Sequence, residues 1–448
     1  MNEELDKIVA QLNTDLVENH KNDTALFGEL TDIQKNLGLL YGDRPTCPFL
    51  RPHFMSRRMY DAISNAAKNI AQAARILADA ALDRPDILGK LDLTERELSL
   101  AKIDPGYEKL CVTSRLDTFI SGETFKFLEY NAETPAGVGD QAQLETVLGH
   151  IPEIRKFLSE NKNWRPKPHQ ALLRALFTAY RESGGHKGKP NIAIVDWEGV
   201  STEAEFYILK DYFESMGFKT LIVDPHELEY DGEKLRAGSF EIDIFYKRVI
   251  IHEFLEKFDD SHPLISAYSD GNICMANSFR VKLAHKKASF AVFTDDEFSD
   301  LFTPQQLLSI REHLPWTRRV EECKTSFGKI EIDLLEYVRK DRHRFLIKPN
   351  DDYGGKGITL GWESTESEWE NALNDGLKDA FILQERVGIK KEIFPVFDKE
   401  VHLEELLVDF DPFLFLNEVE GGLVRLSSSS LVNVTQGGGQ SALVILET

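Results

Sequence analysis

Between residues 190 and 250 the sequence alternates short apolar runs with an amphipathic stretch, and this alternation restricts the possible folds more than any other feature. The apolar runs are 192–196, 220–224 and 242–249, and residues 203–216 between the first two have the spacing of an amphipathic helix. Strands separated by one helix predict a parallel, doubly wound sheet. A dinucleotide site has no support here, because no Gly-x-Gly-x-x-Gly follows the first strand.

The rest of the chain mixes helices and strands. Residues 1–95 are predicted to be helical, with an Ala-, Ile- and Leu-rich stretch over 60–82 that ends before Pro85. Two strands follow at 111–120 and 124–131, and further strands are expected at 344–348, 358–362 and 380–387. With 448 residues, we expect an α/β (α+β) protein of two or three domains.

The composition bears on partners and compartment. Lys and Arg number 53 against 75 Asp and Glu, a formal net charge of −22, so neither nucleic acid nor an anionic membrane is an expected partner. The four cysteines form no Cys-x-x-Cys pair, and the chain shows neither a signal peptide nor an apolar run long enough to span a membrane. The sequence therefore predicts a cytoplasmic protein.

A glycine loop lies between two of the expected strands. Lys348 ends the first strand, and Gly354-Gly355-Lys356-Gly357 precedes the second. Glycines let backbone N–H groups approach phosphate oxygens, and a lysine adds positive charge, which favours a flap over a nucleotide. The loop lacks the ending of a Walker A motif. An ordinary hairpin turn explains the loop alone equally well, since glycine supplies positive φ there.

Four polar residues alternate along the strands 111–120 and 124–131. Arg115 and Asp117 share one face of their strand, and Glu129 and Asn131 share one face of theirs. A two-residue turn would separate Asp117 from Glu129, whereas a three-residue turn at 121–123 would pair Arg115 with Glu129 and gather all four. Carboxylate and amide oxygens of this kind suit Mg²⁺ that also holds nucleotide phosphates.

The alternative for this hairpin is a solvent-exposed surface with an Arg115–Glu129 cross-strand pair. Phe125 and Phe127 are expected on the face of Glu129, which argues for a buried face where charges need partners. Two other positions are weaker candidates. Glu385 ends an apolar strand and is more simply a surface residue, and Lys287 precedes an apolar helix and is more simply a solvated lysine.

Together these pieces resemble the ATP-grasp superfamily. Arg115-x-Asp117, followed by a strand that ends Glu129-Tyr130-Asn131-Ala132, is similar to the glutathionylspermidine synthase group and its circularly permuted relatives. That family places this segment before the lysine-bearing segments, and the present chain has the same order over residues 100–445. The resemblance implies a permuted ATP-grasp fold with a Rossmann-like pre-ATP-grasp domain and an N-terminal helical region.

The resemblance also implies domains and residue roles. The domains would be a helical region (1–95), the metal-ligand segment of the ATP-grasp domain (96–160), the pre-ATP-grasp α/β domain (165–280) and the nucleotide-binding part of the ATP-grasp domain (281–448). Magnesium would be held by Asp117, Glu129 and Asn131, and the transferring phosphoryl group would be stabilised by Arg115 and Arg425. The nucleotide-binding residues would be Lys287, Lys348, Gly354, Gly355, Lys356, Gly357, Gln384, Glu385 and Val387, the last three beside the adenine.

The activity implied is an ATP- and Mg²⁺-dependent ligase that activates a carboxylate as an acyl phosphate for attack by an amine or a thiol, on small-molecule or peptide substrates. The chain lacks the amidase domain of the bifunctional synthases, and its acceptor-binding region matches no substrate that can be named. A phosphotransferase on the same fold and a non-catalytic ATP-binding protein are the alternatives, distinguished by their products. The sequence leaves the acid, the amine and the oligomeric state open.

Overall fold

A six-stranded sheet lies at the centre of the computed structural model, which describes residues 3–429 and 438–447. Its order is β23-β22-β21-β4-β5, with β20 also paired to β21. β4 (Thr113–Ser121) and β5 (Thr124–Asn131) come from the first third of the chain. Their partners β20 (Lys391–Asp398), β21 (Glu400–Phe415), β22 (Glu418–Ser427) and β23 (Gly439–Gln440) come from its end.

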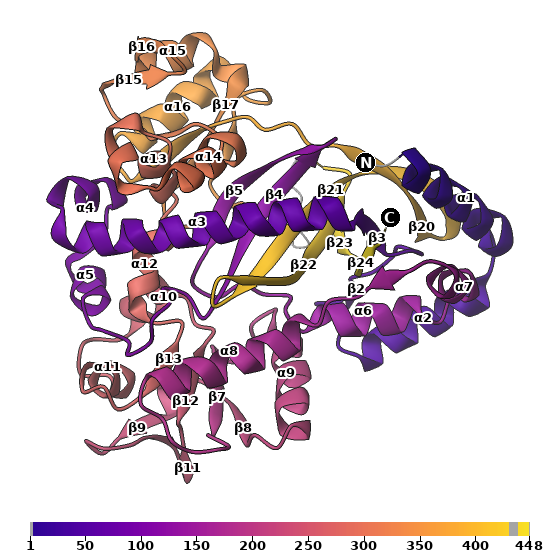
Figure 1. Ribbon diagram of the computed structural model, residues 1–448, viewed down its shortest axis with the longest axis horizontal. Coiled ribbons are helices and arrows are strands. Elements are labelled where there is room, and N and C mark those ends of the chain that lie inside the picture. Colours follow the sequence, from indigo (N-terminus) through magenta and orange to yellow (C-terminus); the bar gives the residue numbers. More distant parts are fainter. Residues whose placement is uncertain (1–2, 430–437, 448) are drawn as a thin grey trace.

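The long helix α3 (Arg57–Asp83) crosses this sheet, as Figure 1 shows. Ser56 begins it by accepting a hydrogen bond from the Met59 N–H, and its buried side is mostly alanine, which allows close approach to β21 and β22. Before it, β3 (His53–Ser56) pairs in parallel with β24 (Leu443–Leu446), so the N-terminal region and the C-terminus share a small sheet with β6 (Asn163–Trp164).

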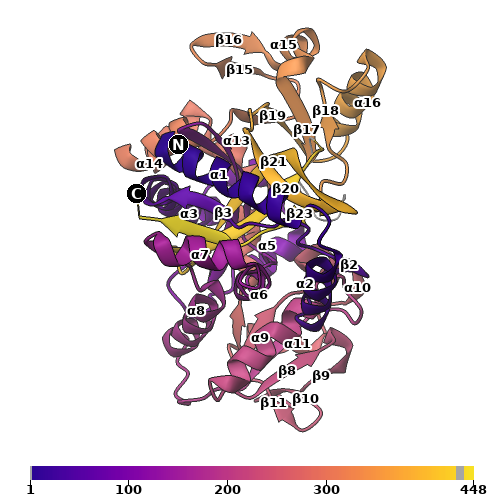
Figure 2. The same cartoon turned by 90° about the vertical axis from the view of Figure 1, so that its right-hand side faces the viewer.

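A parallel sheet of order β13-β12-β7-β8 forms below the central sheet in both views (Figures 1 and 2). Its strands are β7 (Ile192–Val195), β8 (Thr220–Val223), β12 (Ile244–Lys247) and β13 (Cys274–Ala276). The parallel pairing expected from the alternation is confirmed. The chain turns to opposite sides of β7 to form β8 and β12, and the carboxyl ends of strands at such a switch point border a crevice.

A small sheet of order β14-β19-β17-β18 lies at the opposite end of the molecule (Figure 2). It comprises β14 (Thr317–Arg319), β17 (Phe345–Pro349), β18 (Thr359–Leu360) and β19 (Phe381–Glu385), and α15 (Leu334–Lys340) and α16 (Glu366–Gly376) belong to its separate apolar core. β17 pairs antiparallel with β18, so the glycine loop connects the two strands of a hairpin.

The remaining helices and short strands link these three parts. The helices are α1 (Glu3–His20), α2 (Thr24–Asn36), α4 (Pro85–Leu91), α5 (Glu95–Ala101), α6 (Asp140–Leu148), α7 (Pro152–Glu160), α8 (Pro168–Glu182), α9 (Glu203–Ser215), α10 (Ile251–Lys257), α11 (Pro263–Ser269), α12 (Lys282–His285), α13 (Ser289–Phe293) and α14 (Pro304–His313). The short strands are β1 (Leu40–Tyr41), β2 (Arg44–Pro45), β9 (Leu228–Tyr230), β10 (Leu235–Ala237), β11 (Phe240–Glu241), β15 (Lys324–Phe327) and β16 (Ile330–Asp333). Within the described ranges, no helix has the length and apolar composition needed to cross a membrane.

The turn between β4 and β5 differs from the expectation. Ser121 pairs with Thr124, so the turn has two residues rather than three. The register then shifts by one between Asp117 and Thr118, and Leu128 is the extra residue, a β-bulge. The bulge places Asp117 opposite Glu129 and Arg115 opposite Asn131, which restores the shared face that the two-residue turn alone would have lost.

The expectation that Phe125 and Phe127 lie on the same face of the hairpin as Glu129 is wrong. Phe127 pairs with Thr118, which faces away from Asp117, so Phe125 and Phe127 lie on the face opposite Glu129. Both rings are buried in the hydrophobic core and pack against His313 of α14. Their burial therefore concerns the other face of the hairpin. The face that carries Asp117 and Glu129 lines a cavity instead.

Candidate active site

A cavity of about 920 Å³ opens where the three parts of the molecule meet. The central sheet supplies its floor through β4, β5 and β22, the glycine loop and β19 border one end, and the loops after β7 and β12 border the other. Every residue expected at the site lines this cavity except Lys287, Lys356 and Gly357.

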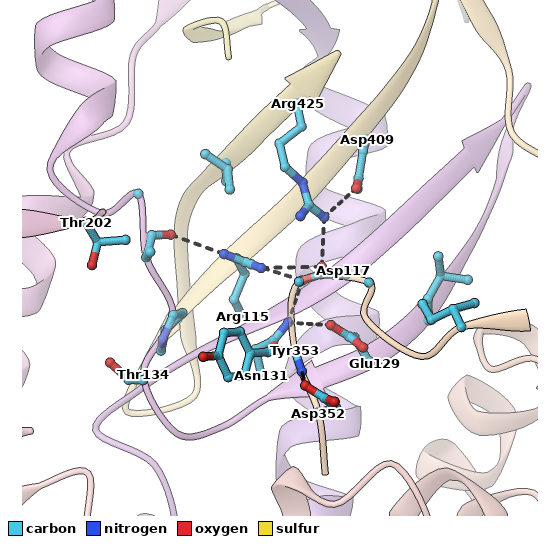
Figure 3. Close-up of a pocket in the computed structure, with 18 of the residues that line it drawn as sticks. Arg115, Asp117, Glu129, Asn131, Thr134, Thr202, Asp352, Tyr353, Asp409 and Arg425 are labelled. Carbon is cyan, nitrogen blue, oxygen red and sulfur yellow. Dashed lines mark hydrogen bonds and ion pairs between the residues drawn. The ribbon is translucent and has the colours of Figure 1, made fainter. Parts of the chain in front are cut away.

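The three expected metal ligands converge on the floor of this cavity. The Asn131 Nδ2 lies 2.7 Å from Asp117 Oδ1 and 3.2 Å from Glu129 Oε1, and Figure 3 shows the three side chains directed toward one another. A 180° turn of the Asn131 carboxamide would present its oxygen to the same point. Three oxygen donors, two of them carboxylates, are a set that fits Mg²⁺.

Asp117 is held by two arginines. Arg115 donates to it from Nε at 2.9 Å and Nη2 at 3.3 Å, and Arg425 donates from Nη2 at 2.7 Å. Burial raises the pKa of Asp117, but the two guanidiniums outweigh burial and hold the pKa well below its usual range. Asp117 is therefore a carboxylate at neutral pH, which a metal ligand requires.

Two further buried acids, Asp409 and Asp411, were not anticipated from the sequence. Both extend from β21 toward Arg425, whose Nη2 lies 2.5 Å from Asp409 and 2.8 Å from Asp411. The available signal was their position: two aspartates at alternate places within the otherwise apolar run 406–415, where a buried charge demands a partner. The site thus has more acids than the hairpin alone provides.

The two expected nucleotide lysines lie above Glu129. Lys287 Nζ is 3.6 Å from Glu129 Oε2 and donates to the Asp352 carbonyl at 2.5 Å, and both Lys287 and Lys348 are buried. Burial lowers the pKa of Lys348 despite the opposing charge of Glu129. Burial raises the pKa of Glu129, but the charges of Lys287, Lys348 and Arg115 together outweigh burial, and the pKa stays below its ordinary value.

The glycine loop covers the cavity only in part. Gly354 and Gly355 line it with φ of +70° and +76°, whereas the Lys356 side chain is exposed and does not line it. The contact of Lys356 with nucleotide phosphates stays a prediction. Gly357 has φ +71°, and a Cβ there would lie 2.7 Å from Pro349 Cγ, so the base of the loop requires glycine.

The base of the glycine loop is tied to the segment that carries Lys287. Asn350 accepts from the Lys287 N–H through its carbonyl and from the Ala288 N–H through its side chain. Asp351 binds Lys282 at 2.7 Å and Lys286 at 2.8 Å. These hydrogen bonds and ion pairs join the two lysine-bearing segments, with Lys287 beside Glu129.

One end of the cavity lies beside β19. Gln384, Glu385 and Val387 line it, as expected for residues beside an adenine. Gln384 is buried, and its amide donates to the Leu128 carbonyl at 3.2 Å and to Thr317 Oγ1 at 3.1 Å. Glu385 is half-buried and lies 3.5 Å from Arg344, outside the cavity centre, so its side chain is oriented by a surface pair.

The opposite end of the cavity lies at the carboxyl ends of β7 and β12. It is lined by Asp140, Asp196, Glu205 and Arg248, and Arg248 donates to the Pro135 carbonyl at 2.7 Å and pairs with Glu205 at 3.4 Å. Burial, together with Glu205, raises the pKa of Asp140 to about 7. Sequence reasoning gave these residues no role, because they come together only through the contact of α6, α9 and β12.

The fold is shared with a solved structure over nearly the whole of both chains. A glutathione synthetase-like effector from Globodera pallida, in its apo form, superposes with a TM-score of 0.62 over 94% of this chain and 97% of its own, at 12% identity. At that identity the likeness concerns the fold alone. No known family model matches the sequence, and no curated protein matches it.

Two other solved structures superpose less well. A γ-glutamylcysteine synthetase-type protein from Methylobacillus flagellatus gives a TM-score of 0.39 at 11% identity, covering 88% of this chain and 89% of its own. D-alanyl-alanine synthetase A from Vibrio cholerae gives 0.28 at 10% identity, covering 50% and 68%. Scores this low support no conclusion about the present chain.

Proposed function

We propose that this protein is an ATP- and Mg²⁺-dependent ligase that joins a carboxylate to an amine or a thiol through an acyl phosphate. One observation carries the proposal: Asp117, Glu129 and Asn131 converge on the floor of the cavity, and Lys287, from a distant segment, lies 3.6 Å from Glu129. Oxygen ligands for a divalent cation and cations for phosphates thus meet at one place, as phosphoryl transfer requires.

The order of the segments supports a permuted arrangement. β4 and β5, with the proposed metal ligands, precede the lysine-bearing segments in the chain yet share a sheet with the C-terminal strands β21 and β22. We accordingly assign residues 96–160 and 281–448 to one ATP-grasp domain, residues 165–280 to a pre-ATP-grasp domain of Rossmann-like type, and residues 1–95 to an N-terminal helical region. The free cysteines agree with a cytoplasmic location.

The chain's own residues would divide the reaction as follows. Gln384 and Val387 border the adenine, and Lys348, which lines the cavity, neutralises the phosphates beneath the glycine loop. Lys287 does not line the cavity and adds positive charge from its position beside Glu129. Arg115 and Arg425 stabilise the charge that develops on the transferring phosphoryl group. Mg²⁺ held by Asp117, Glu129 and Asn131 would supply charge neutralisation between phosphate oxygens. Little covalent work remains for the protein, which positions the reactants.

The far end of the cavity is the proposed place of the acid and the amine. It lies at the switch point of the parallel sheet, where ligands of open α/β sheets bind, and it is continuous with the reacting end at Arg115. Arg115 Nη1 donates to the Ala136 carbonyl at 3.2 Å, so this side chain borders both ends. The substrates would be small molecules or the end of a peptide, consistent with a cavity of about 920 Å³.

Calorimetry of ATP binding with and without Mg²⁺ tests the proposal. We expect Mg²⁺-dependent binding to the wild type and loss of the dependence in Glu129→Gln. Glu123→Gln is the matched control, because Glu123 lies in the turn of the same hairpin and is exposed. Absence of nucleotide binding in the wild type under both conditions would refute the proposal. A subsequent substrate screen separates a ligase, which releases ADP and phosphate, from a phosphotransferase, which forms a stable phosphoester.

A further inference from the structure

The Arg425 guanidinium lies at the centre of a group of three aspartate side chains. Its Nη2 is 2.7 Å from Asp117, 2.5 Å from Asp409 and 2.8 Å from Asp411, and Figure 3 shows the first two contacts. Three carboxylate oxygens of this group lie within 4.8 Å of one another, a spacing that a metal ion can also use. Here the guanidinium nitrogen occupies the position among them.

The strand register explains how Arg425 reaches this position. Asp409 lies directly opposite Arg425 across the β21–β22 pair, and Asp411 follows two residues later on the same face. Asp411 also accepts a hydrogen bond from the Thr118 N–H at 3.0 Å. Asp411 is therefore bound to β4 next to Asp117. Through its contact with Arg425 it also links β22 to the β4–β5 hairpin.

The contacts leave part of the Arg425 guanidinium available. All three ion pairs use Nη2, and Arg425 lines the cavity. Its Nε is buried without a hydrogen-bond partner among the described residues, so Nη1 is the nitrogen left to face a ligand. A guanidinium has five N–H donors in a planar fork, so one held through a single nitrogen keeps donors for an oxyanion. Asp411 is fully buried and does not line the cavity, which excludes it from direct contact with a ligand there.

We propose that Asp409 and Asp411 are positioning residues, which hold the Arg425 guanidinium at the reacting end of the cavity for the terminal phosphate of ATP. This inference rests on the proposed function and names how one of its groups is oriented. Both acids act through Arg425. The competing explanation, a second divalent cation held by Asp117, Asp409 and Asp411, is an outcome that the experiment distinguishes.

The sign of the effect makes the proposal testable. By charge alone, replacing an acid near an anionic ligand with a neutral residue strengthens binding of that ligand. If the acid instead orients an arginine, its removal releases the guanidinium, and the terminal phosphate loses a charge-assisted hydrogen bond. We therefore expect Asp409→Asn and Asp411→Asn to weaken binding of ATP about tenfold, the scale of one such bond, and to leave ADP binding unchanged.

The experiment is calorimetry of ATP and of ADP on the full-length protein, at saturating Mg²⁺ for the affinities and without Mg²⁺ for the Mg²⁺ dependence. Arg425→Gln provides the second background: because the acids act through Arg425, Asp409→Asn should add no further loss of ATP affinity there. Glu405→Gln, on the same strand but paired with Lys391 on the surface, is the matched control and should not change either affinity. Arg425→Lys replaces Arg425→Gln if thermal unfolding shows the latter to be unfolded.

Each remaining result contradicts the inference in a recognisable way. Two results would show that Asp409 is merely structural. One is that Asp409→Asn weakens the binding of ATP and of ADP equally. The other is that it lowers the affinity for ATP equally in the wild type and in Arg425→Gln. Loss of Mg²⁺ dependence in Asp409→Asn, with Arg425→Gln unaffected, would assign the acids to a second cation. Failure of the wild type to bind any nucleotide refutes the proposed function itself and is separate from these outcomes.

Discussion

Replacing Lys282 with methionine should destabilise the protein strongly, because Lys282 is a fully buried member of a balanced charge cluster. Its Nζ lies 2.5 Å from Glu133, 2.7 Å from Asp351 and 3.7 Å from Glu97. Lys286 and Lys247 complete the cluster, which then holds three acids and three lysines. Burial lowers the pKa of the neighbouring His285 to about 4, so this histidine adds no charge at neutral pH.

The expected magnitude follows from the charge that is left over. Methionine fills a volume similar to that of lysine, so the substitution leaves three acids with two lysines and one uncompensated buried negative charge. Removing one partner of a buried ion pair costs about 3–5 kcal/mol. Unfolding entropy of ~2.1 cal/mol/K per residue gives ~0.9 kcal/mol/K for this chain, so Tm should fall by ~3–5 °C if the chain unfolds cooperatively.

Differential scanning calorimetry at pH 7 measures this effect. The matched control is Lys378→Met, because the Lys378–Asp375 pair is exposed and about 3.5 Å long, and surface pairs contribute about 0–1 kcal/mol. Adding Glu133→Gln to Lys282→Met removes the excess negative charge and should recover part of the loss. If Lys282→Met and Lys378→Met lower Tm equally, the cluster does not stabilise the fold as argued.

Two further predictions concern the cavity and its glycine loop. Asp140→Asn should raise the free energy of unfolding by up to ~4 kcal/mol at pH 8 and leave it unchanged at pH 4. The folded-state pKa of Asp140 is raised to about 7, so the folded wild type binds a proton that the unfolded chain does not, and it loses stability as the pH rises from 4 to 7. Identical pH profiles of wild type and variant in urea unfolding would contradict this. Gly357→Ala should lower Tm more than Gly354→Ala. Both glycines have positive φ, where an alanine costs ~1–2 kcal/mol, but only at Gly357 would the added Cβ also contact Pro349. Equal Tm values for the two variants would show that Pro349 moves aside freely.

Local patterns in the sequence determined the elements and the types of residue at the site. The helix expected over 60–82 became α3, the strand expected over 124–131 became β5, and the alternation at 190–250 became the parallel sheet. These predictions succeed because hydrophobic periodicity reflects which face of an element is buried. The same patterns indicated the four polar residues of the β4–β5 hairpin as a group with a shared face.

Only the tertiary structure decided how that group is assembled. The bulge at Leu128 depends on how both faces of the hairpin are covered, and nothing local to residues 111–131 required it. Likewise, Asp409 and Asp411 became part of the site because β21 pairs with β4, a contact between segments about 290 residues apart in the chain. The physical reason is the same in both cases: periodicity describes the burial of one element at a time, whereas register and long-range pairing depend on the elements packed against it.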